Sequence, residues 1–231
     1  MIAIDDILAF IERRKPGFTK TLRPIDPVTL ARIEKLTPKP LPPLYREFLL
    51  RMGQDANRMQ PREAWDLDPA HVVARVAQIG GVGTRFLMLG FDTAFRDPRM
   101  DLYFDREHGD RVVEINAVDE DNYTMDARYD SFADFLITWT ALRFLPGGVV
   151  RQLAVRHVPI TDGPWMRVLA DEGFTTVFAT AQTLIAERGS VYVFARHLLG
   201  EDTAATFVTV MGRFFDPRLS RWARMFEDCV R

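Results

Sequence analysis

The chain has 231 residues, of which 47% are hydrophobic and 27% charged, and its formal net charge is −2. This composition is typical of a soluble globular protein, and the length suits one large domain or two small ones. The single cysteine, Cys229, excludes an intramolecular disulfide and a cysteine-based zinc cluster. No segment has the pattern of a secretory signal or the length of a membrane span, so we expect a cytoplasmic protein without membrane contact.

Helices are expected at residues 3–14, 27–36 and 69–79, where apolar side chains recur at helical spacing. Asp26-Pro27 and Asp68-Pro69 each combine an N-cap residue with a proline that suits the first helical turn. Between the last two of these helices, residues 54–68 are polar with little periodicity. They predict a surface loop anchored by Trp65 and Leu67.

The stretch LPPLYREFLLRMG, residues 41–53, predicts a short amphipathic helix with both ends marked. Prolines open it, and Leu44, Phe48 and Leu49 define its apolar face. Gly53 is expected to end the helix in the left-handed conformation. This helix predicts a packing surface around which the first domain is organised.

A sheet is expected in the middle of the chain. Residues 85–91 are nearly all apolar and predict a central strand, residues 100–105 and 111–115 predict a hairpin, and residues 122–128 predict an edge strand. Ser131 and Asp134 then form a near capping box before an apolar helix. That helix ends near residues 146–148, which we take as the domain boundary.

The last third predicts a helix at residues 164–172, strands at 174–179, 183–187, 191–197 and 205–211, and a final helix from residue 216. The expected fold class is α+β. Residues 1–146 would form a mixed or antiparallel sheet flanked by helices, with an N-terminal helical extension. Residues 147–231 would form a smaller antiparallel α+β lobe.

The order of these elements resembles the SUKH superfamily, which includes the Smi/Knr-type cell-wall regulators and many bacterial immunity proteins. The resemblance covers residues 26–144: a helix at 27–36, LPPLYREFLLRMG, the strand FLMLGF, the hairpin DLYFDREHGDRVVEI, and YDSFADFLITW. Residues 92–96 depart from the glycine-rich turn that many members have after the strand. The resemblance implies an intracellular immunity protein that masks a toxin domain.

No catalytic, cofactor-binding or metal-binding constellation is evident. His71, His108, His157 and His197 do not occur at metal-ligand spacing, and Cys229 has no base nearby in the sequence. The glycines at positions 80, 81 and 83 follow a helix and precede a strand, which is the wrong order for a dinucleotide fingerprint. We therefore expect a protein that is not an enzyme and needs no cofactor.

Acidic residues concentrate in the middle of the chain. Residues 91–136 hold thirteen acidic residues and five arginines, a net of −8. Such a field attracts a basic protein and repels nucleic acid, although acidic residues also serve solubility. The paired acids of the hairpin, such as Asp101 and Asp105, are expected to be solvated.

The expected partner-binding residues lie in predicted loops, namely Asp92, Asp97, Asp119, Glu120 and Asp121. The function indicated is a protein-binding module that neutralises a basic toxin domain. The alternatives are a regulatory scaffold with another partner, or an enzyme with a site between the two lobes.

Overall fold

A computed structural model describes residues 2–60, 65–80, 83–94, 100–117, 123–145, 149–156, 160, 164–198 and 205–211. The fold class is α+β, as predicted. The chain divides into two compact units, Met1–Phe135 and Leu136–Arg231. This division falls inside helix α5, ahead of the segment where the sequence placed the boundary.

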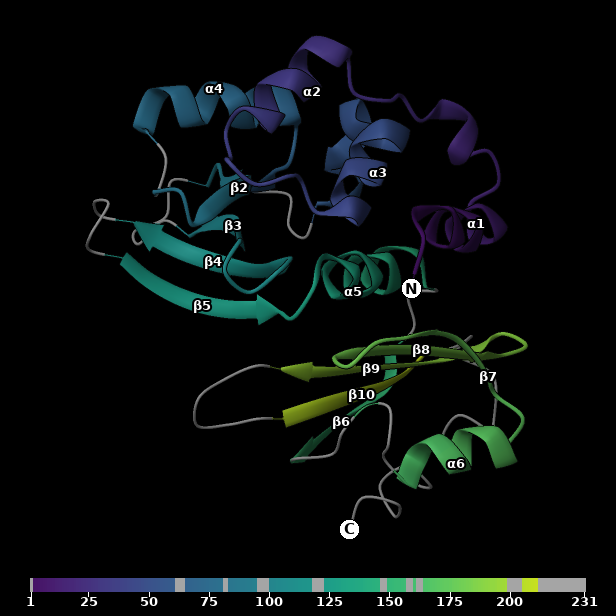
Figure 1. The fold of residues 1–231 in the computed structure, drawn as a ribbon. Helices are drawn as coiled ribbons and strands as arrows, with labels where there is room; N and C mark the ends of the chain where they lie inside the picture. Colours follow the sequence, from purple (N-terminus) through teal and green to yellow (C-terminus); the bar gives the residue numbers. More distant parts are fainter. Residues whose placement is uncertain are drawn as a thin grey trace. The chain divides into compact units, whose positions relative to one another are not determined.

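The first unit carries a five-stranded sheet in the order β1-β2-β3-β4-β5, and every neighbouring pair is antiparallel. Figure 1 shows β2 to β5 side by side, with α4 next to β2. The elements are α1 Ile4–Arg14, η1 Thr19–Thr21, α2 Pro27–Glu34, α3 Pro43–Met52, η2 Gly53–Met59, β1 Trp65–Asp66, α4 Pro69–Ile79, β2 Phe86–Asp92, β3 Asp101–Asp105, β4 Arg111–Ala117, β5 Tyr123–Tyr129 and α5 Phe132–Phe144.

Helices pack on both faces of this sheet. Successive strand side chains point to opposite faces. Tyr103 therefore belongs to the cluster that Val72 of α4 completes. Its neighbour Phe104 lies 4.9 Å, centroid to centroid, from Tyr45 of α3 and 5.4 Å from Phe132 of α5.

From the sequence we expect one core that comprises Leu44, Phe48, Leu49, Phe86, Leu89, Phe132, Phe135 and Leu136. The structure instead divides these side chains between the two faces of the sheet. Phe48 and Phe132 pack edge-to-face at 5.6 Å, whereas Phe86 lies in the other cluster, with Val72 and Tyr103. Two buried faces explain why β2 reads as a continuous apolar run.

The N-cap predictions are confirmed. Asp26 accepts a hydrogen bond from Thr29 N at 2.8 Å, and Asp68 accepts one from Ala70 N at 2.9 Å. Ser131 Oγ accepts from Asp134 N at 3.1 Å at the start of α5. These side chains satisfy amide donors that a helix leaves unpaired at its first turn.

Helix α3 forms where expected, but its buried face is rotated. Tyr45, Phe48, Leu49 and Met52 are buried, whereas Leu44 is only half-buried. The phenol ring of Tyr45 packs among aromatic rings from β3 and α5. The aromatic neighbours, which helical spacing alone does not reveal, decide which side of the helix faces inward.

Gly53 does not end α3 in the left-handed region, because its φ is −56° and its ψ is −39°. The chain continues into the short helix η2. Glycine is needed there for space: a Cβ at this position would lie 2.7 Å from Ile25 Cβ and 3.1 Å from Ile25 N. The close approach lets Ile25 N donate to Leu49 O at 2.9 Å, in addition to the bond that Leu49 O accepts from Gly53 N.

The polar stretch after α3 is more ordered than predicted. It contains η2 and the two-residue strand β1, which pairs with β2 through Trp65 opposite Asp92. The anchoring role of Trp65 is confirmed by its burial, and Leu67 is buried as well. Asn57 holds the segment by accepting from Leu67 N at 2.6 Å.

The second unit is a five-stranded antiparallel sheet in the order β6-β10-β9-β8-β7, with helix α6. The elements are β6 Val149–Arg156, α6 Pro164–Asp171, β7 Thr175–Ala179, β8 Thr183–Arg188, β9 Val191–Leu198 and β10 Ala205–Met211. Leu169 of α6 packs against apolar side chains of β8, β9 and β10. Strand β6 was not predicted, and the expected last helix lies outside the described residues.

Candidate functional site

Most of the acidic side chains of residues 91–136 that the structure describes are buried or contact other groups of the first unit. Nine of the thirteen lie in the described residues, and five of these nine are buried: Asp92, Asp101, Asp105, Glu114 and Asp134. The other four each contact an arginine or a backbone amide of the chain: Glu107, Asp110, Asp126 and Asp130. The acidic run is therefore in large part structural.

Asp92 corrects the prediction most directly. It was expected in a solvated loop, but it is the last residue of β2 and is buried. Its Oδ1 accepts from Ala94 N at 2.7 Å, and its own N–H donates to Asp101 Oδ1 at 2.9 Å. Asp101, also expected to be solvated, is buried with it. The remaining predicted binding residues, Asp97, Asp119, Glu120 and Asp121, lie outside the described residues.

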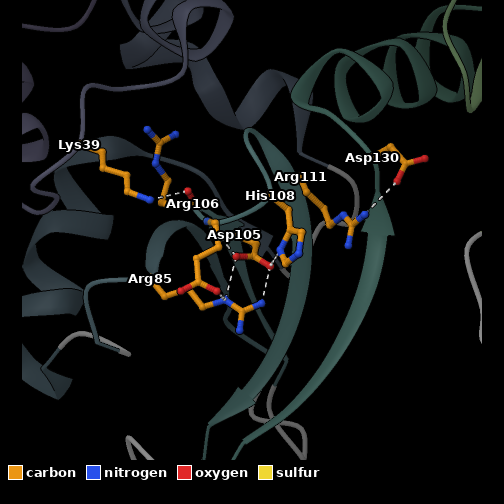
Figure 2. A network of polar contacts seen from close by, with 8 residues as sticks. Lys39, Arg85, Asp105, Arg106, His108, Arg111 and Asp130 are labelled. Carbon is orange, nitrogen blue, oxygen red and sulfur yellow. Dashed lines mark hydrogen bonds and ion pairs between the residues drawn. The ribbon is translucent and has the colours of Figure 1, made fainter.

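Asp105, at the end of β3, is the centre of the densest polar network in Figure 2. Its carboxylate is fully buried. Oδ1 accepts from Arg85 Nε at 2.9 Å and Glu107 N at 3.2 Å, and Oδ2 from Arg85 Nη2 at 2.7 Å. His108 Nδ1 lies 2.7 Å from Oδ2, and since an ionised carboxylate only accepts, this nitrogen carries the proton.

These contacts decide what Asp105 can do chemically. Burial raises the pKa of its carboxyl, but the hydrogen bonds from Arg85 and His108 outweigh burial and lower the pKa to about 2. Four donors fill the carboxylate's acceptor sites. Because a useful general base has a pKa near the working pH, Asp105 is suited to holding the β3–β4 turn rather than to catalysis.

The same turn is tied to the proline-rich loop before α3. Lys39 Nζ donates to Arg106 O at 2.9 Å, and the Arg106 guanidinium donates back to Pro40 O. Burial lowers the pKa of Arg106. Figure 2 shows the Lys39 side chain directed at the Arg106 carbonyl oxygen. These two hydrogen bonds connect the loop that leads into α3 with the β3–β4 turn.

A second Asp–His pair lies between β1 and α4. His71 Nδ1 is 2.7 Å from Asp66 Oδ2, and Asp66 Oδ1 accepts from Asn57 Nδ2 and Asp68 N, both at 2.9 Å. The hydrogen bond that His71 donates to the Asp66 carboxylate raises the pKa of His71. The pKa of Asp66 is lowered, since its hydrogen bonds outweigh the effect of burial. This pair fastens β1 to the first turn of α4.

His197 does not join these pairs. His197 lies in β9 with Nδ1 3.1 Å from Thr206 Oγ1, and His157 and Cys229 lie outside the described residues. Within the described ranges, no three His, Cys, Asp or Glu side chains come together as metal ligands.

The β4–β5 hairpin is where acidic charge exceeds the available cations. Residues 111–130 hold six acidic residues and two arginines, a net of −4, and Arg111 lies 3.7 Å from Asp130. Arg128 already contacts Glu114 at 2.9 Å and Asp126 at 2.7 Å. The predicted binding residues 119–121 belong to the segment that joins β4 to β5.

Sequence reasoning missed Arg85 as the partner of Asp105, because the two are 20 residues apart. A local signal did exist. An aspartate before a turn commonly binds the amide two residues on, as Asp105 binds Glu107 N.

Comparisons with family models, curated proteins and solved structures returned no match. In the portion of the chain that the structure describes, no helix combines the length and apolar character that crossing a membrane requires.

Proposed function

We propose that the chain is a cytoplasmic protein-binding module of the SUKH type that masks a basic toxin domain. The element order supports the resemblance, since α2, the proline loop, α3, β2, the β3–β4 hairpin and α5 follow one another as in the stretches that carry it. A fold by itself does not determine a function, so the binding proposal depends on a feature of the surface.

That feature is the acidic surplus of the β4–β5 hairpin. Of the two arginines of the hairpin, Arg111 contacts Asp130, and Arg128 is shared by two carboxylates, Glu114 and Asp126. The rest of the hairpin has three acidic residues and two arginines, and positions 119–121 add three more acidic residues. An uncompensated field of this sign raises the association rate of a basic partner, and nuclease toxins need basic surfaces to hold phosphate.

Charge reversal tests the proposal. Replacing Asp119, Glu120 and Asp121 by lysine should slow association with the cognate partner by about tenfold or more at low salt, and by less at high salt. The matched control replaces Glu34, Glu47 and Asp171 by lysine, which gives the same change in net charge on α2, α3 and α6. Equal slowing by both variants would mean that only the total charge matters, and would overturn the proposal.

The partner is found by pull-down from cell extract at low and high salt. A captured toxin domain whose activity is lost in the complex supports neutralisation. A captured protein that remains fully active in the complex contradicts neutralisation and favours a regulatory scaffold.

A further inference from the structure

The two sheets have four outer strands, and β5 is the best suited of these to accept another strand. Strand β1 has two residues, and the pairing of β7 is interrupted by a bulge between Thr176 and Phe178. Strand β6 pairs with β10 without interruption from Arg151 to Arg156, but its sequence holds two arginines and no acidic residue, which disfavours a basic partner. Strand β5 pairs with β4 without interruption over five residues, from Tyr123 to Ala127, before a bulge, and it belongs to the acidic hairpin.

Strand β5 pairs with β4 alone among the described strands. The backbone groups on the other side of an edge strand form a row of donors and acceptors that a further strand can bind. Five residues give a ladder of about 17 Å. Met125, in the middle of the row, has 40% of its surface exposed and offers an apolar contact to the added strand.

Charge selects what can pair there. Glu114 and Asp126 face each other across β4 and β5 and share Arg128, so the described end of the hairpin remains negative. Charged edges discourage pairing between identical chains, and opposite charges across neighbouring strands are favourable. A basic strand fits this edge better than a second copy of the chain does.

We propose that β5 accepts an extended basic segment of the partner protein as a sixth strand of the first sheet. The proposal rests on the proposed function and narrows it, because it names the backbone of residues 123–127 as the binding surface. The acidic turn then accelerates the encounter, and the main-chain ladder holds the complex.

The probe is a peptide about eight residues long in which lysine and valine alternate. The intact chain is mixed with it, and amide hydrogen exchange is followed residue by residue. We expect slower exchange at β5 and unchanged exchange at β1 and β7. A peptide with the same charges but with alternate amides N-methylated should bind at least about tenfold more weakly, since two or three hydrogen bonds are lost.

Substitutions complete the test. Met125→Lys places a cation on the edge and should weaken the lysine–valine peptide by about tenfold. Thr176→Lys, on exposed β7, should leave binding unchanged. Equal binding of the methylated peptide, no protection at β5, or insensitivity to Met125→Lys would overturn the proposal. If the natural partner still binds in a salt-dependent way under those outcomes, the proposed function stands and only the strand addition fails.

Discussion

Replacing Asp105 by asparagine tests whether the network in Figure 2 stabilises the first unit. The change keeps the shape of the side chain but removes its charge and puts an amide NH₂ where an oxygen accepted hydrogen bonds. One donor of Arg85 or His108 then faces another donor. The burial of Asp105 leaves no water to repair that mismatch.

The magnitude follows from the pKa of Asp105. Its contacts lower the pKa from 3.8 to about 2, and each pH unit corresponds to about 1.4 kcal/mol. The charged carboxylate therefore contributes about 2 kcal/mol to the free energy of unfolding at neutral pH. Because the folded pKa is the lower one, this contribution is present above pH 3.8 and is lost as the pH falls towards 2.

Urea denaturation at pH 7, 4 and 3 measures the effect. Asp105→Asn should lower the free energy of unfolding by about 2 kcal/mol at pH 7, and the gap to the wild type should narrow as the pH falls. The control is Asp130→Asn, whose partner Arg111 lies 3.7 Å away on a half-exposed surface. It should cost less than about 1 kcal/mol. A loss for Asp105→Asn that is equally small, or that does not change with pH, would refute the reasoning.

Three further predictions concern stability. Phe48→Ala should cost about 3–5 kcal/mol, and Leu44→Ala clearly less, because only Phe48 is fully within the core; thermal denaturation of both variants checks this. Gly53→Ala should also lower the melting temperature, since its methyl group has no room, and a melting curve equal to wild type would contradict the close approach. The pKa of His71 is raised above 6.5 by Asp66, so its contribution is full below pH 6.5 and lost as the pH rises through the raised pKa. An NMR titration of His71, with Asp66→Asn as the comparison, should show the midpoint falling.

Local signals in the sequence predicted most of the elements. Asp26 and Asp68 mark helix starts because an aspartate carboxylate accepts hydrogen bonds from the amides of the first turn, and the proline that follows fits the first helical position. Both caps are found in the structure. Strands β7 to β10 of the second unit form where residues 174–179, 183–187, 191–197 and 205–211 predicted them. Strand β6 was missed, because it directly follows the glycines taken as a domain boundary.

Long-range packing was less accessible to sequence reasoning. Helical spacing placed Leu44 inward, but the rings of Phe104 and Phe132 draw Tyr45 inward instead. Likewise, glycine is a common residue at helix ends, so the sequence assigned Gly53 that role. The close approach of Ile25 shows instead that glycine is needed there because a side chain would not fit. Both features depend on contacts between segments that the sequence separates.

The acidic residues show the same limit for function. A sequence alone does not distinguish a run of carboxylates that binds a partner from one that forms hydrogen bonds and ion pairs within the fold. Asp92 and Asp105 look like loop and hairpin-surface residues, yet both are buried and hydrogen-bonded. What separates the two uses is whether a cation or an amide of the same chain is within reach. Around Asp105 the N–H donors of Arg85 and His108 converge on one carboxylate, whereas at β4 and β5 the single guanidinium of Arg128 contacts two carboxylates.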